Sequence, residues 1–487
     1  MPPGPLGMPI FGNILQLRRS LYWGQAHRVE RKMRTEGNIL SINILGQHIV
    51  AINDFATSAE LLGRRSGIYS DRPRLIVANK LMCNNKNPAF LPYGEHWRKV
   101  RKAGHEGFNT RAVEAYRPMQ EEHAARRVSA LLIDPTNIDS HIRRSAASTV
   151  LSVIYGWQAL DPSMDSVMQV INNWVDKTAR EAVPRHLVEI FPWMLHIPTA
   201  LAPWKKWALQ QRHEDRRLFQ GFVEGMKDTT ESKVSCCATM ILANSERFGL
   251  NLEDVAWLCG GFFASSIRFF LLAMLLHPES MRRARQEIDT VVGRSRLPTF
   301  ADEPNLPYIS AMVKEVFRWR PVAPLNISNG RNFLVVLPLT RAKQDDWYNG
   351  YFIPKGTVVI QNIWGMNHDP AVFAGPDVFC PERYLDRNGH ARYPVQDTMG
   401  FGHASFGAGR RICCGRDLAV QSLFINVATI LWAADILPAK SADGKLVKTH
   451  LSLLNFHREP APFKCVLNIR AENVLQIAGR VIHAQDT

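Results

Sequence analysis

The stretch Phe406-Gly407-Ala408-Gly409-Arg410-Arg411-Ile412-Cys413-Cys414-Gly415 decides the fold of this chain. Its spacing is Phe-x-x-Gly-x-Arg-x-Cys-x-Gly, and such a match arises by chance in a chain of this length with a probability on the order of 10⁻⁴. The stretch closes a Gly- and Pro-rich region over 367–415, and an amphipathic helix is predicted over 416–434. Backbone N–H groups at the start of a helix stabilise a thiolate. We therefore interpret Cys413 as a thiolate ligand.

A thiolate is the ligand that donates most electron density to a haem iron, which favours cleavage of the O–O bond. In this interpretation Arg411 pairs with a haem propionate and Phe406 packs near the sulfur. Gly409 and Gly415 let the chain pass close to the cofactor. The alternatives are a structural cysteine in a Gly-rich turn and the adjacent Cys414 as ligand, but the spacing selects Cys413.

Three further motifs agree with this interpretation. Trp97-Arg98-Lys99-Val100-Arg101 has the form Trp-x-x-x-Arg, Glu315-Val316-Phe317-Arg318 has the form Glu-x-x-Arg, and Phe379-Cys380-Pro381-Glu382-Arg383-Tyr384 contains Pro-Glu-Arg. Each is weak alone, because a basic helix facing solvent or an i, i+3 surface pair explains it as well. Together with the cysteine stretch, they make nearly the whole chain resemble the cytochrome P-450 family. The chain is most similar to fungal members of the O-methylsterigmatocystin oxidoreductase-like kind.

The resemblance implies roles for the motif residues. Glu315, Arg318 and Arg383 form a buried ion network behind the haem loop, which makes sense as a device that fixes register. Trp97 and Arg101 are haem-propionate donors one helical turn apart, and His105, one turn further along, is a third candidate. The implied cofactor is haem b, with Cys413 as the ligand of the iron.

The expected fold is mainly α with small β-sheets, an α+β arrangement in which haem lies between a long central core helix and the cysteine loop. A hairpin is predicted over 38–54 with Gly46 near its turn, further strands over 347–363, and mostly helix over 95–290. We expect a Pro- and Gly-rich lead-in over 1–20, a single catalytic domain over 21–470 with a smaller β-rich part, and a C-terminal tail over 471–487.

Two segments allow a membrane interpretation. Residues 255–276 carry one charge, Arg268, and are long enough to span a bilayer, but a buried core helix capped by Asn251 and stopped at Pro278 is favoured. Residues 191–209 mix aromatics, prolines and lysines, and either a surface loop or a patch at a membrane interface fits them equally well. In the chain as given, Met1 is followed at once by Pro2-Pro3-Gly4-Pro5, so we expect no N-terminal anchor or signal segment in it.

The sequence departs from the family in two places. The central helix of the family carries an acid–Thr pair that helps deliver protons to dioxygen, whereas Cys259 to Phe270 has none. Roughly two helical turns are missing there. The remaining hydroxyls, Ser265 and Ser266, are the candidate catalytic groups, but a role as small polar residues that close a helix contact is favoured. The link over 326–343 is longer than usual and lacks the family's His-Arg pair, so Arg331 or Arg341 is the candidate replacement at a propionate. An imperfect gene model and a diverged paralogue both explain these departures.

The predicted function is a monooxygenase that inserts one oxygen atom from O2 into an apolar small molecule, in fungal secondary metabolism or against xenobiotics. By resemblance, electrons come from NADPH through a flavoprotein cytochrome P-450 reductase, at the cytosolic face of the endoplasmic reticulum membrane. The net charge of +15 suits an acidic partner or a membrane surface, and no nucleic-acid motif is present. The alternatives are a peroxide-using or isomerase-type haem-thiolate enzyme and an inactive relic.

Overall fold

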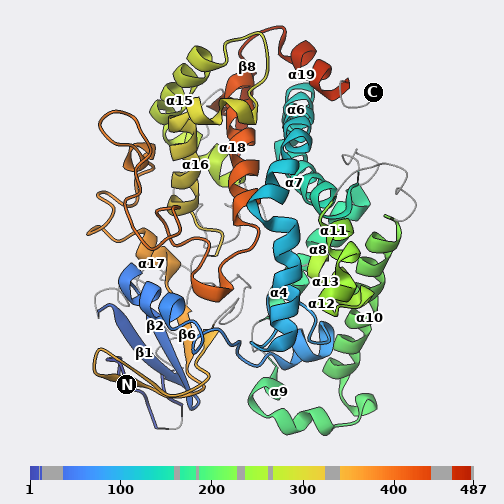
Figure 1. The fold of residues 1–487 in the computed structure, drawn as a ribbon, viewed down its shortest axis with the longest axis vertical. Helices are drawn as coiled ribbons and strands as arrows, with labels where there is room; N and C mark the ends of the chain where they lie inside the picture. Colours follow the sequence, from blue (N-terminus) through green and yellow to red (C-terminus); the bar gives the residue numbers. More distant parts are fainter. Residues whose placement is uncertain are drawn as a thin grey trace.

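The computed structural model describes residues 1–9, 11–13, 37–157, 165–182, 186–226, 236–260, 267–323, 340–439 and 463–483. Helices dominate it, with a small sheet at one end and a strand pair at the other (Figure 1). The prediction of a mainly α fold with small sheets is confirmed. The longer helices are α4 (Glu95–Phe108), α6 (Arg117–Ile133), α7 (Ile138–Tyr155), α8 (Asp165–Glu181), α10 (Pro203–Glu224), α13 (Leu252–Gly260), α14 (Ile267–Leu276), α15 (Pro278–Val291), α16 (Pro307–Trp319), α18 (Arg416–Ala433) and α19 (Val474–His483).

Short helical segments connect these helices and turn the chain. The α-helical ones are α3 (Phe55–Ser58), α5 (Thr110–Ala115), α9 (Leu187–Ile190), α11 (Cys237–Ala243), α12 (Ser245–Phe248) and α17 (Ile363–Asn367). Two are π-helical, η1 (Ala59–Arg64) and η2 (Ile76–Met82). The 3₁₀ turns are η3 (Pro135–Asn137), η5 (Pro192–His196), η6 (Thr199–Leu201), η7 (Phe300–Asn305), η8 (Pro381–Tyr384) and η9 (Gly409–Arg411).

The main sheet joins two stretches that lie far apart in the sequence. Strands β1 (Ile39–Ile44) and β2 (Gln47–Ile52) form an antiparallel hairpin, and its turn residues Leu45 and Gly46 have φ angles of 48° and 84°. Two consecutive positive φ values give a turn whose twist matches the strands, so the predicted hairpin is confirmed. Strand β6 (Val358–Gln361) lies parallel to β2, and β3 (Thr340–Arg341) completes the order β1-β2-β6-β3.

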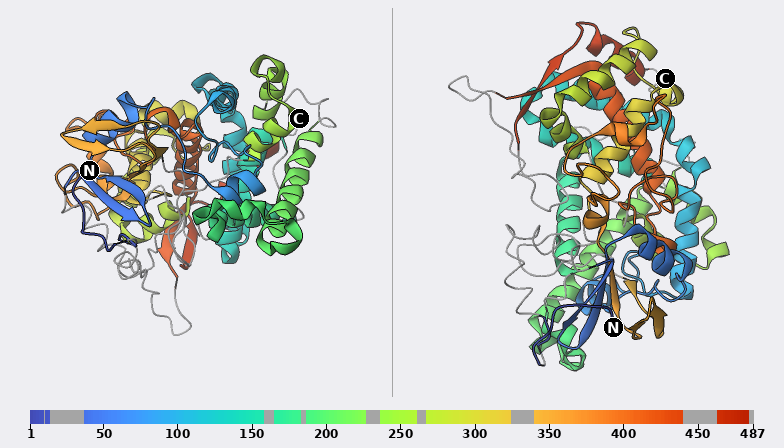
Figure 2. Two further views of the ribbon diagram at one scale, coloured as in Figure 1. Left: turned by 90° about the horizontal axis from the view of Figure 1, so that it is seen from below. Right: turned by 90° about the vertical axis from the view of Figure 1, so that its left-hand side faces the viewer.

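Two strand pairs stand apart from this sheet. Strands β4 (Asp346–Tyr348) and β5 (Tyr351–Ile353) form a small hairpin within the predicted 347–363 region. Strands β7 (Ala434–Pro438) and β8 (Cys465–Ile469) pair at the end of the molecule opposite the main sheet (Figure 2). Helix α19 follows β8, buries Val474, Ile477 and Ala478, and packs against α6. The segment predicted to be a tail therefore contains a packed helix, and the predicted domain boundaries stay predictions.

The predicted core helix over 255–276 corresponds to two described helices, α13 and α14, and the residues between them lie outside the described part. Asn251 caps α13 by accepting a hydrogen bond of 2.9 Å from the backbone of Asp254. Helix α13 packs in one apolar core with α4, α7, α8, α10 and α11, whereas α14 packs in another with α15, α16 and α18. Burial of both helices favours the core interpretation. Among the described helices, none has the length and apolarity needed to cross a membrane.

Candidate active site

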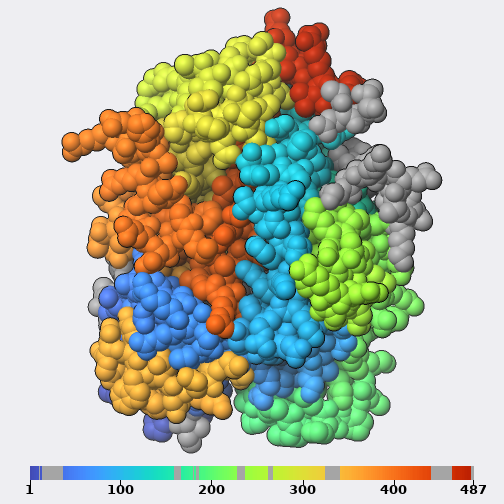
Figure 3. Space-filling model, viewed as in Figure 1, coloured from blue at the N-terminus to red at the C-terminus, as the bar shows by residue number. Residues whose placement is uncertain are grey.

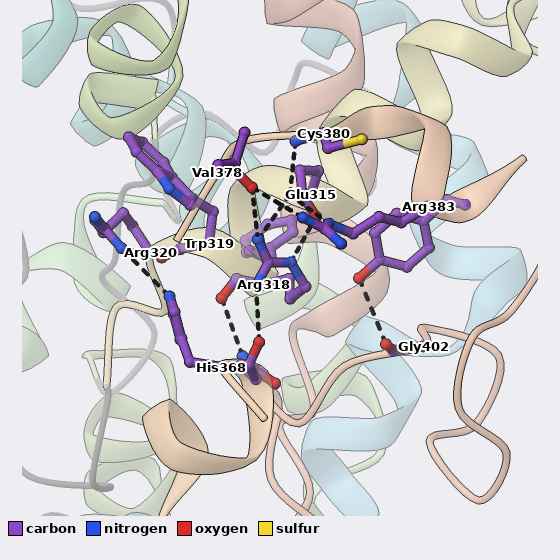
Figure 4. A network of polar contacts seen from close by, with 12 residues as sticks. Glu315, Arg318, Trp319, Arg320, His368, Val378, Cys380, Arg383 and Gly402 are labelled. Carbon is purple, nitrogen blue, oxygen red and sulfur yellow. Dashed lines mark hydrogen bonds and ion pairs between the residues drawn. The ribbon is translucent and has the colours of Figure 1, made fainter. Parts of the chain in front are cut away.

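A buried ion pair on α16 is the centre of the polar contacts behind the cysteine loop (Figure 4). The guanidinium of Arg318 donates to both carboxylate oxygens of Glu315, over 2.6 and 2.7 Å, and neither side chain is exposed. Burial alone would lower the pKa of Arg318, but the Glu315 carboxylate outweighs it and holds the pKa above its ordinary value. The i, i+3 spacing seen in the sequence is thus a bidentate buried pair and not a surface pair.

The third member of the predicted network, Arg383, reaches the same carboxylate from η8. Its Nε lies 3.4 Å from Glu315 Oε1, and its Nη2 donates to the carbonyls of Gly375 and Val378 over 2.8 and 3.2 Å. The backbone N–H of Cys380 also donates to Glu315 Oε1, over 2.8 Å. One carboxylate therefore ties α16 to the segment that contains Pro-Glu-Arg, as the resemblance implies.

Asn367, at the end of α17, connects this network to the cysteine loop. Its carbonyl accepts from Arg318 Nη1 over 2.8 Å, and its Oδ1 accepts from the backbone of Ala404 over 2.8 Å. Its Nδ2 donates to Ser405 Oγ over 2.9 Å, and Ser405 Oγ donates to the Phe317 carbonyl over 2.7 Å. The sequence interpretation missed both residues, because hydropathy patterns do not reveal a buried amide or hydroxyl and no spacing marked them.

The cysteine loop itself is closed by its backbone. The N–H of Cys413 donates to the Phe406 carbonyl over 2.9 Å, and α18 begins three residues later. Gly409 has a φ of 64°, and a β-carbon there would lie 1.7 Å from the carbonyl oxygen of Leu62 in η1. Only glycine fits at this position. The close approach of Gly409 is thus to η1, whereas a β-carbon on Gly415 would meet no atom within 4 Å.

Cys413 is exposed in area although protein atoms surround it closely. Burial raises the pKa of its thiol to about 12, and Cys414 adds to this, while the N–H of Gly415 and the cations Arg101 and Arg416 oppose it. The two properties are compatible. The accessible area of the side chain depends on the space directly against the sulfur, whereas the desolvation of the thiol also depends on protein atoms further away. The thiol is therefore accessible, but the protein around it disfavours its charged form. A bound cation would remove the thiol proton and favour the thiolate there.

Three predicted cofactor contacts converge beside this loop. The Arg411 guanidinium lies over the Trp97 ring, 4.2 Å from its centroid, and Arg101 Nη2 donates to the Ile412 carbonyl over 2.6 Å. Arg411 Nε and Nη2 donate to the carbonyls of Ser70 and Leu91 over 2.8 and 2.7 Å. Its Nη1 is buried and has no partner in the described part of the chain. Burial lowers the pKa of the Arg411 guanidinium to about 9. A buried cation with one N–H group lacking a partner fits an anionic ligand.

The remaining predicted residues fall into four groups. Phe406 packs on Phe317 at a centroid distance of 5.0 Å and on His403 at 5.5 Å, so it belongs to an aromatic cluster under the loop. The ring of His105 is exposed and forms no hydrogen bond with other described residues. Arg341 donates to Asp71 Oδ2 over 2.6 Å. Ser265, Ser266 and Arg331 lie outside the described residues.

The Cytochrome P450 family model matches residues 2–461. Cytochrome P450 monooxygenase 58 of Postia placenta is 41% identical, with 97% of this chain and 90% of that protein covered. Cytochrome P450 monooxygenase ARMGADRAFT_1018420 of Armillaria gallica is 40% identical, with 91% and 84% covered, and monooxygenase iboC of Amanita muscaria is 32% identical, with 97% and 92% covered.

The chain belongs to the cytochrome P450 family, as its motifs predicted, and it has fungal relatives. Its fold is that of a solved zebrafish cytochrome P450 with abiraterone, with a TM-score of 0.68 at 20% sequence identity over 91% of this chain and 99% of that one. Family membership implies an oxidoreductase of the monooxygenase type with cysteine-ligated haem.

Replacing Glu315 by Gln should destabilise the protein strongly, because it leaves Arg318 buried without its counter-charge. We expect a loss of about 3–5 kcal/mol in the free energy of unfolding, measured by urea denaturation. Glu279→Gln is the matched control, since Glu279 and Arg282 have the same i, i+3 spacing but are 68% and 55% exposed. The control should lose less than about 1 kcal/mol, and equal losses in the two variants would contradict the assignment.

His403 should make the protein less stable in acid. Burial lowers its pKa to about 3, with Lys314 and Arg318 adding to the effect. The unfolded chain therefore binds a proton between about pH 6.5 and 3 that the folded chain does not, and this group costs up to about 1.4 kcal/mol per pH unit as the pH falls through that window. In His403→Gln the decline of Tm with pH should be shallower, whereas the exposed His390→Gln should match the wild type. Parallel curves for all three proteins would refute this role.

Proposed function

We propose that this chain is a haem-thiolate monooxygenase with Cys413 as the iron ligand, acting on an apolar small molecule. The observation that carries the proposal is the convergence of Trp97, Arg101 and Arg411 on the loop that presents the accessible Cys413 thiol. Haem b, when bound, supplies activation of dioxygen. A role in secondary metabolism or against xenobiotics is the proposed context, in line with the fungal relatives.

The residues of this chain have separate tasks toward the haem. Arg411, through its unpaired Nη1, and Arg101 bind the propionates, and Trp97 donates its indole N–H beside them. His105 is a further propionate donor on the same face of α4. Phe406 and its aromatic neighbours keep water from the sulfur. Gly409 lets the loop pack against η1, and Gly415 is proposed to leave room for the cofactor.

Proton delivery is assigned to Ser265 and Ser266, the hydroxyls that remain where the family carries its acid–Thr pair. A second candidate function follows from that departure: a haem-thiolate protein that uses peroxide or isomerises a substrate, or one that is inactive. It is favoured by the sequence Cys259 to Phe270, which has no acid–Thr pair.

Electrons are proposed to come from NADPH through a flavoprotein reductase. Arg98, Lys99 and Lys102 are exposed on α4, and Arg410 is exposed on the cysteine loop. The blue α4 and the orange segment near residue 400 meet on one face of the molecule (Figure 3). A face with this charge suits an acidic partner and accelerates its association.

A membrane surface is the second proposed partner, at the cytosolic side of the endoplasmic reticulum. Leu187, Trp193 and Leu201 of the α9–η6 segment are 62%, 65% and 75% exposed. Lys206 is exposed beside them, whereas Lys205 donates to the carbonyls of Leu195 and Ile197 and so holds the segment in shape. Exposed apolar side chains on a segment that is held by hydrogen bonds suit insertion at the lipid interface. A membrane-bound site is also consistent with an apolar substrate.

Cys413→Ala should abolish the Soret band that a thiolate-bound, reduced carbon-monoxide complex gives, because the iron loses its sulfur ligand. Cys414→Ala is the matched control, since it removes the neighbouring thiol and leaves the ligand. The control should keep the band position of the wild type. A band lost in Cys414→Ala and kept in Cys413→Ala would overturn the ligand assignment.

The oxidant and electron source that support turnover distinguish the two candidate activities. A monooxygenase oxidises an apolar substrate with NADPH, reductase and O2, and Ser265→Ala/Ser266→Ala should then raise the fraction of NADPH spent on peroxide, because proton delivery is lost. Product formed only from added peroxide, with no response to reductase, would favour the second candidate.

A further inference from the structure

Arg127 places a cation in the apolar core around α6. The residue is only 2% exposed. Its neighbours on the helix, Ala124, Ala125 and Val128, belong to the core that α6 shares with α14 and α18. Helices α7, α18 and α19 pack against α6 (Figure 1). The guanidinium of Arg127 is therefore shielded from bulk water.

This guanidinium has no counter-charge within the described ranges of the chain. Its Nε and Nη1 are buried without a hydrogen-bond acceptor there, and no described carboxylate forms an ion pair with it. Burial lowers the pKa of Arg127 to about 9, so the side chain is still a cation at neutral pH. Two other buried arginines differ in this respect. Arg318 is paired with Glu315 over 2.6 Å, and Arg268 is paired with Asp139 over 2.8 Å.

The imidazole of His123, one turn earlier on α6, does not supply the missing partner. Ser152 Oγ donates its proton to the Trp157 carbonyl over 2.5 Å, so it accepts the hydrogen bond of 3.1 Å from His123 Nε2. Nδ1 is then the acceptor for Ser148 Oγ, also over 3.1 Å. Burial lowers the pKa of His123 to about 3, and the charge of Arg127 adds to this. His123 is therefore neutral, and both of its ring nitrogens are already used.

We propose that Arg127 binds a small inorganic anion, chloride, inside the core beside α6. An unpaired charge in a protein interior is strongly destabilising. A buried water molecule satisfies N–H groups but leaves the charge uncompensated, whereas an anion does both. A monatomic ion needs the least room and accepts hydrogen bonds from any direction. Because chloride binds only the folded chain here, it acts as a stabilising structural ligand. The inference does not depend on the proposed function.

The first test measures the apparent Tm of the full chain in sodium chloride and in sodium gluconate of equal ionic strength. Gluconate is too large for a buried site, and equal ionic strength keeps the screening of surface charges the same. We expect chloride to raise the Tm of the wild type by roughly 2 °C when its concentration is a hundred times its Kd.

Arg127→Met should abolish this chloride effect, because it removes the charge and the donors at nearly constant volume. In gluconate the variant should be no less stable than the wild type, since an unpaired buried charge has been removed. Arg126→Met is the matched control. Arg126 is the next residue on the same helix, and its Nε donates to Glu122 over 2.6 Å. This control should keep the full response to chloride.

Bromide locates the site directly. Crystals of the full chain grown in sodium bromide should show an anomalous peak within hydrogen-bond distance of the Arg127 guanidinium. If Arg127→Met does not fold, Arg127→Lys tests the same site, because it keeps the charge but loses the planar set of donors. Its response to chloride should be present and weaker than that of the wild type.

Three results would overturn the proposal. The first is a water molecule without anomalous signal at Arg127, together with equal Tm values in the two salts. The second is a chloride effect of the same size in the wild type, Arg127→Met and Arg126→Met, which would assign it to the protein surface. The third is a carboxylate of the chain itself in contact with Arg127, in which case Arg127→Met loses stability in both salts.

Discussion

The rest of this structure depends on the bidentate contact between Arg318 and Glu315 on α16. Two charges without solvent are stable only if every remaining donor and acceptor is satisfied, and here the partners come from α17, η8 and the segment around Val378. Satisfying this pair therefore fixes where four segments meet. Asn367 then passes the same constraint to Ala404 and Ser405, where the cysteine loop begins.

The cysteine loop is positioned from two sides, by hydrogen bonds on one side and by close packing of the backbone on the other. From α16 it is held by hydrogen bonds to buried charges and amides, and Phe406 packs into an aromatic cluster. On the side of η1 the loop is held by steric fit, because Gly409 approaches the backbone of Leu62 so closely that no side chain fits at this position. Two residues further along the loop, Arg411 donates hydrogen bonds to the carbonyls of Ser70 and Leu91. Cys413 is thus a side chain on a loop with very little freedom.

Most of this arrangement could be predicted from the sequence. Three of its features are local patterns: the Phe-x-x-Gly-x-Arg-x-Cys-x-Gly spacing, the Glu-x-x-Arg pair and the hairpin at Gly46. Local patterns can be recognised in a single sequence, because all their residues are close together in the chain. Asn367 and Asp71 could not be found, because the side chain of each accepts from a backbone group far away in the chain and has no periodicity of its own. The close approach of Gly409 to η1 and the pairing of Arg341 with Asp71 are likewise products of tertiary packing.

The parallel pairing of β2 with β6 has a consequence for how the protein is made. Ile49 lies opposite Val358, and Asn362 donates to Asn53 across 309 positions of sequence. At roughly 5–20 residues per second of synthesis, β2 waits tens of seconds for its neighbour. Strands with unpaired edges are aggregation-prone while they wait. The β1–β2 hairpin leaves the ribosome long before β6 and the cysteine loop exist, so a chaperone or an early contact has to shield that edge.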